Sequence, residues 1–558
     1  MAGLIDAKPP AIVVLGTGAL QTARRIQARY PGALVHGLTN RVQADVAFTE
    51  LSAHLRELYS SNTPIVALCA AGIVIRCLAP LLADKTVEPP VLAVAEDGSA
   101  VVPLLGGLGG VNVMAREIAA VLQVAPAITT SGELRFGTCL LNPPAGYVLA
   151  DIEHGKRFVS DLLAGSTTRI EGNAPWLDQV ELPRASDANR AIRISPHVSE
   201  HAGELMIHPR SVVICVNAVR SDDPIAERIR RALLEAKISP LSVAAMLAPV
   251  SMMTSARLIE AAHVLDVPLR FGALPDGFET FRAHDEDLAI SIASHPVDVA
   301  NLGQARGTLT VIGLGPGSAD LMVPAAKYVL SLADDILGYE TYVRMAGPFK
   351  PNQILHCTDN REEMQRARHA LELASTGRRV VVVSSGDPGV FAMAAAVLEA
   401  LDAGQSNEAW SSVDLNILPG VSAALATAAR AGAPLGHDFC MLSLSDNLKP
   451  WAVIEMRLRH AAQADLVMAF HNPVSRARPW QLDRALEIVR EYRDGTTTVV
   501  LGRNIGRPGE TLITTTLANL HSDQVDMRTM VIVGSSTTRS FARGDGNGEW
   551  AYTPRWYE

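Results

Sequence analysis

The chain has 558 residues, of which 48% are hydrophobic and 19% charged, the composition of an ordinary globular protein with room for about three or four domains. Its net charge of −9 argues against a general nucleic-acid-binding surface. The six cysteines are scattered and form no CxxC pair, so the sequence indicates neither a zinc motif nor a disulfide framework, and reduced thiols in a cytoplasmic protein are expected.

Residues 1–150 predict an N-terminal α/β domain that begins with an apolar strand at residues 11–15. This apolar run is too short to span a bilayer, and no run of 18 apolar residues occurs elsewhere, so no membrane association is expected. A glycine-rich turn at residues 106–110 precedes a helix that Asn112 is expected to cap. Such a turn either binds an anion at the helix N-terminus or only makes a tight crossover, and the local pattern leaves both open.

The remainder of the first half divides into three segments. Residues 151–210 form a middle segment with dispersed polar residues and no usable motif. Residues 211–284 alternate apolar strands with amphipathic helices, which predicts a compact α/β module. Residues 285–306 are expected to form the linker to the second half.

The second half opens with GTLTVIGLGPGSAD at residues 307–320. Residues 308–312 predict a β-branched strand, and Ser318 or Asp320 is expected to cap the helix that follows. Glycines in the turn between them would let the backbone approach a bound molecule closely. They are Gly313, Gly315 and Gly317.

A dinucleotide is the first candidate ligand for this turn, since Gly313 and Gly315 match the start of the GxGxxG fingerprint. The third glycine of that fingerprint is replaced by Ser318. Pro316 also removes a backbone N–H that would hold a phosphate. The sequence therefore disfavours an NAD site.

Five predicted strands of the second half end in turns rich in Gly, Pro, Ser, Asp or Asn. The fold class is therefore α/β and multidomain, with ligand turns at strand ends. Several such turns on one side of a sheet would form a cleft with little side-chain bulk. The turns lie at residues 313–317, 384–389, 419–423, 471–473 and 502–510.

This set of turns, in this order, resembles the cobalamin and uroporphyrinogen tetrapyrrole methylases, which are two-domain α/β enzymes. The resemblance covers residues 307–540 and predicts subdomains at 307–418 and 419–545. The general family motifs are GLGPG at 313–317, SSGDPGVF at 384–391 and LPGVSAALATAARAGAPLGHDF at 418–439. Three more motifs resemble the precorrin-3B methyltransferase branch: SLSDNLKPW at 443–451, FHNP at 470–473 and GRNIGRPGE at 502–510.

The resemblance implies S-adenosyl-L-methionine as cofactor, methylation at ring carbon 17 of precorrin-3B, and ring contraction to precorrin-4 in cobalamin biosynthesis. It also implies a homodimer formed through the methylase half. The alternatives are an anaerobic type of enzyme that acts on cobalt-factor III and opens the cobalt-precorrin-5A lactone, and a corrinoid-binding carrier.

The first half is similar to the cobalt-precorrin-5A hydrolase family, chiefly through AGIVIRCLAPLLADK at residues 71–85. That family usually has SGHLGGAN where this chain has GGLGGVN at residues 106–112, one residue shorter and without the histidine. The lost histidine argues against lactone hydrolysis. Binding of a corrinoid intermediate or a scaffolding role are the other readings.

Methyl transfer from a sulfonium chiefly requires alignment of the nucleophilic carbon, the methyl group and the sulfur, and it needs no metal. Backbone groups from glycine turns meet that requirement without placing charges beside a cation. By resemblance, the cofactor-binding residues are Gly313, Gly315, Pro316, Gly317, Ser385, Gly386, Asp387, Val390, Ser422, Ala423 and Asn472.

Ring contraction also requires that a proton leave a tertiary hydroxyl of the substrate, so a positioned base is expected. The candidates are Asp446, His437, His471 and Asp438, each of which can instead be a cap or an ordinary turn residue. The substrate, a polycarboxylate tetrapyrrole, calls for arginine partners. Arg503 and Arg507 are the favoured ones, and Arg344, Arg476 and Arg478 are further candidates.

Overall fold

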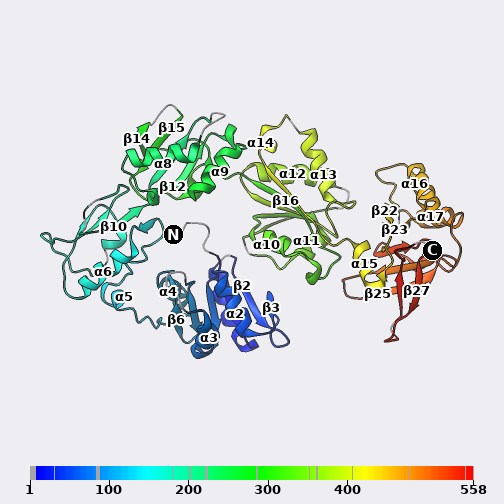
Figure 1. Ribbon diagram of the computed structural model, residues 1–558, viewed down its shortest axis with the longest axis horizontal. Helices are drawn as coiled ribbons and strands as arrows, with labels where there is room; N and C mark the ends of the chain where they lie inside the picture. Colours follow the sequence, from blue (N-terminus) through cyan, green and yellow to red (C-terminus); the bar gives the residue numbers. More distant parts are fainter. Residues whose placement is uncertain are drawn as a thin grey trace. The chain divides into compact units, whose positions relative to one another are not determined.

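The computed structural model describes residues 8–30, 32–82, 88–178, 180–199, 201, 203–219, 224–283, 287–350, 352–359, 362–404, 406–475, 477–546 and 548–556. The chain divides into two compact units, Met1–Arg306 and Gly307–Glu558. Each unit is built of sheets covered by helices (Figure 1). Among the described residues, every helix is too short or too polar to cross a lipid bilayer.

The first sheet of unit 1 has the strand order β3-β2-β1-β4-β5-β6, parallel except for β6. Its strands are β1 (Ala11–Val14), β2 (Leu34–Leu38), β3 (Val46–Phe48), β4 (Ile65–Leu68), β5 (Val91–Val94) and β6 (Val101–Leu105). Its helices are α1 (Leu20–Arg29), α2 (Leu51–Ser60), α3 (Ala71–Leu78) and α4 (Val111–Leu122). β1 is buried along its whole length, because α1 and α4 cover one face of the sheet and α2 and α3 cover the other.

The glycine turn before α4 is a tight crossover. A Cβ on Gly106 would lie 2.5 Å from the carbonyl oxygen of Pro89, so the backbone approaches too closely for any other residue. Asn112 does not cap α4, since the N-cap is Gly110. The buried Asn112 amide instead donates to Glu133 Oε1 at 2.7 Å. The close approach of Pro89 explains why the turn has a glycine at residue 106.

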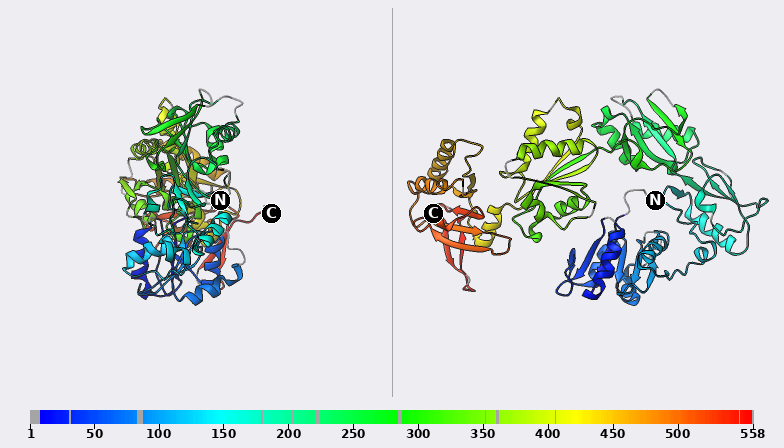
Figure 2. Two further views of the ribbon diagram at one scale, coloured as in Figure 1. Left: turned by 90° about the vertical axis from the view of Figure 1, so that its left-hand side faces the viewer. Right: turned by 180° about the vertical axis from the view of Figure 1, so that it is seen from behind.

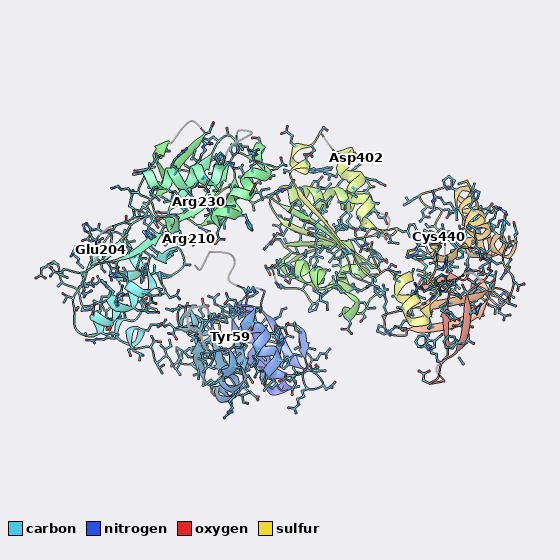
Figure 3. All side chains as sticks on the ribbon, viewed as in Figure 1. Tyr59, Glu204, Arg210, Arg230, Asp402 and Cys440 are labelled. Carbon is cyan, nitrogen blue, oxygen red and sulfur yellow. The ribbon has the colours of Figure 1, made fainter. Side chains whose placement is uncertain are left out.

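The second sheet, in the segment for which the sequence offered no motif, has the order β7-β10-β9-β8. Its elements are β7 (Tyr147–Leu149), β8 (Arg169–Glu171), β9 (Ala191–Ile194), β10 (Glu204–Pro209), α5 (Ser131–Phe136), α6 (Ile152–Leu163) and α7 (Pro175–Asp178). Glu204, labelled in Figure 3, accepts two hydrogen bonds from Arg193 and one from Ser199. The Arg193 hydrogen bonds lower the pKa of Glu204 to about 2.

The third sheet of unit 1 has the order β13-β12-β11-β15-β14. Its elements are β11 (Val212–Val216), β12 (Val243–Ala248), β13 (Leu269–Phe271), β14 (Phe278–Ala283), β15 (Leu288–Ala293), α8 (Ile225–Glu235) and α9 (Ala256–Leu265). The segment 285–306 was expected to be a linker, but β15 lies inside this sheet, antiparallel to β11. The period-two pattern of LAISIA, with Leu288 and Ile290 buried, was the strand signal.

The first sheet of unit 2 is fully parallel, in the order β18-β17-β19-β16-β20. Its strands are β16 (Thr308–Gly313), β17 (Asp335–Tyr339), β18 (Ile354–Thr358), β19 (Arg379–Ser384) and β20 (Asp414–Leu418). Its helices are α10 (Pro324–Leu332), α11 (Glu340–Ala346), α12 (Glu363–Ser375), α13 (Met393–Ala403) and α14 (Glu408–Ser411). α12 and α13 cover one face and α10 and α11 the other, as Figure 2 also shows from behind.

The second sheet of unit 2 has the order β22-β23-β26-β24-β25. Its elements are β22 (Phe439–Ser443), β23 (Val467–His471), β24 (Thr498–Arg503), β25 (Thr511–Thr516), β26 (Thr529–Val533), α15 (Ala423–Ala431), α16 (Trp451–Gln463) and α17 (Gln481–Arg490). A small third sheet contains β21 (Gly432–Ala433), β27 (Arg539–Ala542) and β28 (Glu549–Tyr552). β22 is parallel to β23, and β23 and β24 are both antiparallel to β26, so β22, β23 and β24 end at the same edge.

Candidate active site

Three glycine-rich turns meet at the carboxyl edge of the β16 sheet. They follow β19, β16 and β20, which are adjacent parallel strands, so their carboxyl ends lie side by side. Gly386 donates its N–H to the carbonyl of Gly315 at 2.8 Å, and Gly315 donates to the carbonyl of Gly386 at 3.2 Å. The predicted turns 313–317 and 384–389 are therefore hydrogen-bonded to each other beyond the ends of their strands.

The third turn crosses the other two at a distance that only glycine permits. A Cβ on Gly313 would lie 2.4 Å from the carbonyl oxygen of Gly386, and a Cβ on Gly420 would lie 2.2 Å from the same oxygen. The Cα of Gly420 would be only 2.8 Å from the Cβ placed on Gly313. The centre of the site is consequently built of backbone atoms.

The Asp387 carboxylate joins two of these turns. Its Oδ1 accepts the N–H of Gly389 at 2.8 Å and its Oδ2 accepts the N–H of Gly420 at 3.0 Å. Both oxygens are thus used to hold backbone groups, and hydrogen bonds to an ionised acceptor are the stronger kind. Asp387 fixes the turn after β19 against the turn after β20.

The open side of Gly386 faces the start of α15. Ser422 is the N-cap of this helix, and its Oγ accepts the N–H of Leu425 at 3.3 Å. A Cβ built on Gly386 would meet nothing nearer than Ser422 Cα at 3.6 Å and Ala423 N at 3.8 Å. Since the first N–H groups of a helix lack intrahelical partners, backbone donors line this space. Val390, half-buried, donates its N–H to the carbonyl of Asp387 at 3.2 Å.

The turn after β16 leads to the helix α10 through a short 3-10 segment. Ser318 caps that segment, Ala319–Leu321, by accepting the N–H of Asp320 at 3.2 Å. The α-helix itself begins only at Pro324. Ser318 is therefore a cap, as predicted, but of the 3-10 segment.

The second sheet contributes the loops that follow β22 and β23. Ser443 and His471, the last residues of these strands, are register partners. Asn472, which has a positive φ of 52°, donates its side-chain amide to Ser443 Oγ at 3.2 Å. Leu444 donates its N–H to the carbonyl of His471 at 3.0 Å. The loop that contains Asp446 is thus held beside His471 and Asn472.

His471 and Asp446 differ in how their polar atoms are held. Burial lowers the pKa of His471 to about 4, so its ring is neutral at pH 7. Among the described residues, no group hydrogen-bonds its buried Nε2. The Asp446 carboxylate accepts both of its contacts, at 3.3 and 3.2 Å, from the buried amide of Gln481.

The structure does not bring His437 and Asp438 to this edge. Both precede β22, whereas the loop that carries Asp446 follows it. The five residues of β22 span roughly 16 Å at about 3.3 Å each. His437 Nδ1 accepts the N–H of Asp438 at 2.8 Å. The LGHDF motif stands before a strand, so its histidine lies at the amino edge of the sheet.

Arg507 reaches from the loop after β24 to two of the glycine-rich turns. Its Nε donates to the carbonyl of Pro316 at 2.6 Å, and its Nη2 donates to Ser385 Oγ at 3.2 Å. A Cβ on Gly317 would lie 2.4 Å from Arg507 Cγ, so the glycine makes room for the arginine. The sequence predicted that Arg507 binds a substrate carboxylate. In the structure its guanidinium group instead donates hydrogen bonds to groups of the protein.

The other arginine candidates for substrate binding that the structure describes each have a different partner in the protein. Arg503 forms an ion pair with Asp526, with 2.9 Å between Nε and Oδ2. Arg478 is buried and donates to the carbonyl of Asn472 at 3.1 Å. The exposed Arg344 pairs with Glu340 beside a cavity of about 380 Å³. Arg476 lies outside the described residues.

Two residues that the sequence did not single out lie between the two groups of loops. The Phe391 ring packs edge-on against His471, with 5.3 Å between ring centroids. Lys449 Nζ lies 5.7 Å from the Phe391 ring centroid. Both belong to motifs noted in the sequence, SSGDPGVF and SLSDNLKPW, and their place in those motifs was the available signal.

Two stretches of the chain match family models of known proteins. Residues 308–521 match the family model described as Tetrapyrrole (Corrin/Porphyrin) Methylases, and residues 53–133 match the one described as Cobalamin synthesis G N-terminal. A Precorrin-3B C(17)-methyltransferase from Sinorhizobium sp is 51% identical over 251 residues, which are 45% of this chain and 97% of that protein.

Cobalamin biosynthesis protein CobIJ from Mycobacterium tuberculosis (strain ATCC 25618 / H37Rv) is 46% identical over 255 residues, 45% of this chain and 48% of that protein. A crystal structure of the methyltransferase CobJ is 50% identical, covers 44% of this chain and 100% of that chain, and has a TM-score of 0.42. Because a relative with 51% identity is covered over 97% of its length, the chain belongs to the tetrapyrrole (corrin/porphyrin) methylase family.

Proposed function

We propose that this protein is an S-adenosyl-L-methionine-dependent methyltransferase that methylates ring carbon 17 of precorrin-3B, with ring contraction to precorrin-4. The observation that carries the proposal is the convergence of three turns on Gly386, where any Cβ on Gly313 or Gly420 would collide with backbone. The relative from Sinorhizobium sp, whose name states this methylation, supports the choice of substrate.

The residues around Gly386 fit the cofactor. The space beside it, next to Ser422 and Ala423, is one that a Cβ would fill, and it is lined by backbone donors at the start of α15. When bound, the cofactor supplies an activated methyl group. Both carboxylate oxygens of Asp387 accept backbone N–H groups, those of Gly389 and Gly420. Its role is therefore to keep the turns in place while the methyl group is aligned.

For the proton of the substrate hydroxyl, we propose Asp446 as acceptor and His471 as a neutral hydrogen-bonding partner. The Asp446 carboxylate has contacts from one amide, that of Gln481, and an ionised carboxylate can accept more. A histidine with a pKa of about 4 is a weak base at pH 7, but its buried Nε2 can orient a hydroxyl. His437 is left out because it lies at the other edge of the sheet.

We propose that Arg503 binds a substrate carboxylate, which would replace Asp526 as its ion-pair partner. Both side chains of the present pair are partly exposed, so the substrate can reach Arg503. Asn472 remains a proposed neighbour of the cofactor, held against Ser443. Arg507 is reassigned from substrate contact to a residue that holds the turns containing Pro316 and Ser385.

A cobalt-containing substrate is the second candidate. A Cobalt-factor III methyltransferase from Priestia megaterium is 41% identical over 234 residues, against 51% for the relative named for precorrin-3B. The match of residues 53–133 to the Cobalamin synthesis G N-terminal model favours a second corrinoid function in unit 1, either lactone opening or binding of an intermediate.

The test is turnover by the full chain with methyl-labelled S-adenosyl-L-methionine. Metal-free precorrin-3B is expected to gain one labelled methyl group, as followed by mass spectrometry, and to contract its macrocycle by one carbon that stays in the molecule, as followed by NMR spectroscopy. Preferential turnover of cobalt-factor III would select the second candidate. Absence of methylation of either substrate would reject both.

The proposal extends to the organisation of the chain. We propose domain boundaries near residues 210, 306 and 418, and the division after Arg306 supports the main one. The boundaries predicted at residues 150 and 284 each cut a sheet, since β7 begins at Tyr147 and β15 pairs with β11. We also propose a cytoplasmic homodimer formed through unit 2, which light scattering of the full chain tests: a monomeric mass would reject the dimer.

A further inference from the structure

Phe391 combines two features that packing alone does not explain. Its φ is +55°, in the left-handed region that residues other than Gly, Asn and Asp seldom adopt. Its side chain is also exposed to 51%. Strained residues persist where the surrounding structure holds them, and they are concentrated at ligand sites. The turn after β19 therefore presents a phenyl ring to solvent at a conformational cost.

The ring stands between the two groups of loops that form the site. Its edge contacts His471 at the end of β23, and Lys449 from the loop after β22 lies over it. Leu448, which precedes Lys449, is 91% exposed. We call Phe391, Leu448 and Lys449 the Phe391 shelf. It presents an aromatic ring, an aliphatic side chain and an ammonium group beside the cofactor turns.

Lys449 is available to a ligand. Within the described part of the chain, no carboxylate lies within ion-pair distance of its ammonium group. Burial, with a smaller contribution from the charge of Arg457, lowers the pKa of Lys449. A half-buried cation without an anionic partner favours a ligand that brings a carboxylate.

We propose that the Phe391 shelf is a binding subsite for the conjugated ring system and one peripheral carboxylate of a polycarboxylate tetrapyrrole. The ring of Phe391 stacks against the macrocycle, and Lys449 pairs with the carboxylate. This inference rests on the proposed function for its substrate class, and it assigns the residues that recognise that substrate. A role of the Phe391 ring in substrate binding would explain why this position has a phenylalanine despite its strained positive φ.

The test separates substrate binding from turnover. Uroporphyrin III, a conjugated octacarboxylate, is titrated by fluorescence quenching into the full chain saturated with S-adenosylhomocysteine. The variants are Phe391→Ala, Phe391→Gly and Lys449→Gln. Phe541→Ala and Lys327→Gln are matched controls, because Phe541 is 55% exposed on β27 and Lys327 is exposed on α10.

We expect the Kd of uroporphyrin III to rise about tenfold in both Phe391 variants, the loss of ~1.4 kcal/mol that one stacking contact provides. Lys449→Gln is expected to raise it and to weaken its dependence on salt, since an ion pair is lost. Phe391→Gly should melt no lower than Phe391→Ala, because glycine relieves the positive φ. The Kd of S-adenosylhomocysteine should stay within about twofold in every variant.

The proposal is overturned if the variants bind uroporphyrin III like the wild type, if the controls weaken it equally, or if the wild type does not bind it. A parallel rise in the Kd of S-adenosylhomocysteine would also overturn it, since Phe391 would then only support the cofactor turn. The proposed function is tested separately by turnover of precorrin-3B, so a wild type that binds the probe but methylates nothing rejects that function and leaves the subsite standing.

Discussion

Arg507 donates its Nε–H to the carbonyl oxygen of Pro316, 2.6 Å away and 191 residues earlier in the chain. The same guanidinium donates to Ser385, so one side chain from the second subdomain holds two turns of the first. Gly317 and Gly506 leave the space for this contact, since a Cβ on Gly506 would lie 3.1 Å from Pro316 Cγ. The proposed cofactor site is therefore completed across the two subdomains of unit 2.

Arg507→Lys is expected to lower the affinity for S-adenosylhomocysteine about tenfold, because an ammonium group cannot reproduce the two-pronged contact to Pro316 and Ser385. Isothermal titration of the full chain measures the Kd. Arg539→Lys on β27 is the control, since Arg539 is exposed and distant in sequence from these turns. An unchanged Kd with a raised KM for the tetrapyrrole would restore Arg507 to the role of substrate clamp.

Asp387→Asn is expected to weaken S-adenosylhomocysteine binding and to lower the melting temperature of the transition that this ligand shifts. An amide can accept only one of the two N–H groups, from Gly389 and Gly420, and its NH₂ then faces the other. The lost charge-assisted hydrogen bond costs about 2 kcal/mol. Asp178→Asn, an exposed aspartate in unit 1, should leave both quantities unchanged. Wild-type values for the Asp387 variant would mean that its carboxylate does not join the turns.

Gly420→Ala is expected to be among the most damaging single changes in unit 2, because the new methyl group would lie 2.2 Å from the carbonyl oxygen of Gly386. Relief requires the backbone of one turn to move, at about 1–3 kcal/mol. Thermal melting and S-adenosylhomocysteine titration both report it. Gly544→Ala is the matched change, with nothing within 4 Å of the added Cβ. Equal behaviour of the two variants would contradict the close crossing of the turns.

His471 makes the stability of unit 2 depend on pH in a definite direction. Burial lowers its pKa from 6.5 to about 4, so the unfolded chain takes up a proton before the folded chain does. Its contribution, at most about 3 kcal/mol, is therefore complete above pH 6.5 and is lost progressively as the pH falls towards 4.

The measurement is the melting temperature of the ligand-shifted transition at pH 7 and pH 5, for the wild type and for His471→Gln. The variant is expected to lose less stability between the two values than the wild type does. His437→Gln, at the opposite edge of the sheet, is the control. Identical pH profiles for the wild type and His471→Gln would show that this histidine is not buried in its neutral form.

The glycine turns of unit 2 could be predicted because their signal is local. Gly313, Gly386 and Gly420 each follow a short apolar strand, and parallel strands bring such ends to one edge. The same reasoning failed for His437, since a motif that precedes a strand lies at the edge opposite to one that follows it.

Contacts made over long sequence separations could not be predicted. The partner of Arg507 lies 191 residues away, and nothing in GRNIGRPGE indicates that the guanidinium turns toward Pro316. The sheet built from residues 147–209 was missed because its strands are short, three to six residues, and one of its faces carries ion pairs such as Arg193–Glu204. β15 was missed because it is separated from its partner β11 by three intervening strands and two α-helices.

A crystal structure of the full chain with S-adenosylhomocysteine tests the central claim most directly. The ligand is predicted to lie against the backbone of Gly386 and the first residues of α15, with Arg507 still bonded to Pro316. Ligand density elsewhere in the chain, with the space beside Gly386 filled by solvent, would contradict the assignment of these turns as the cofactor site.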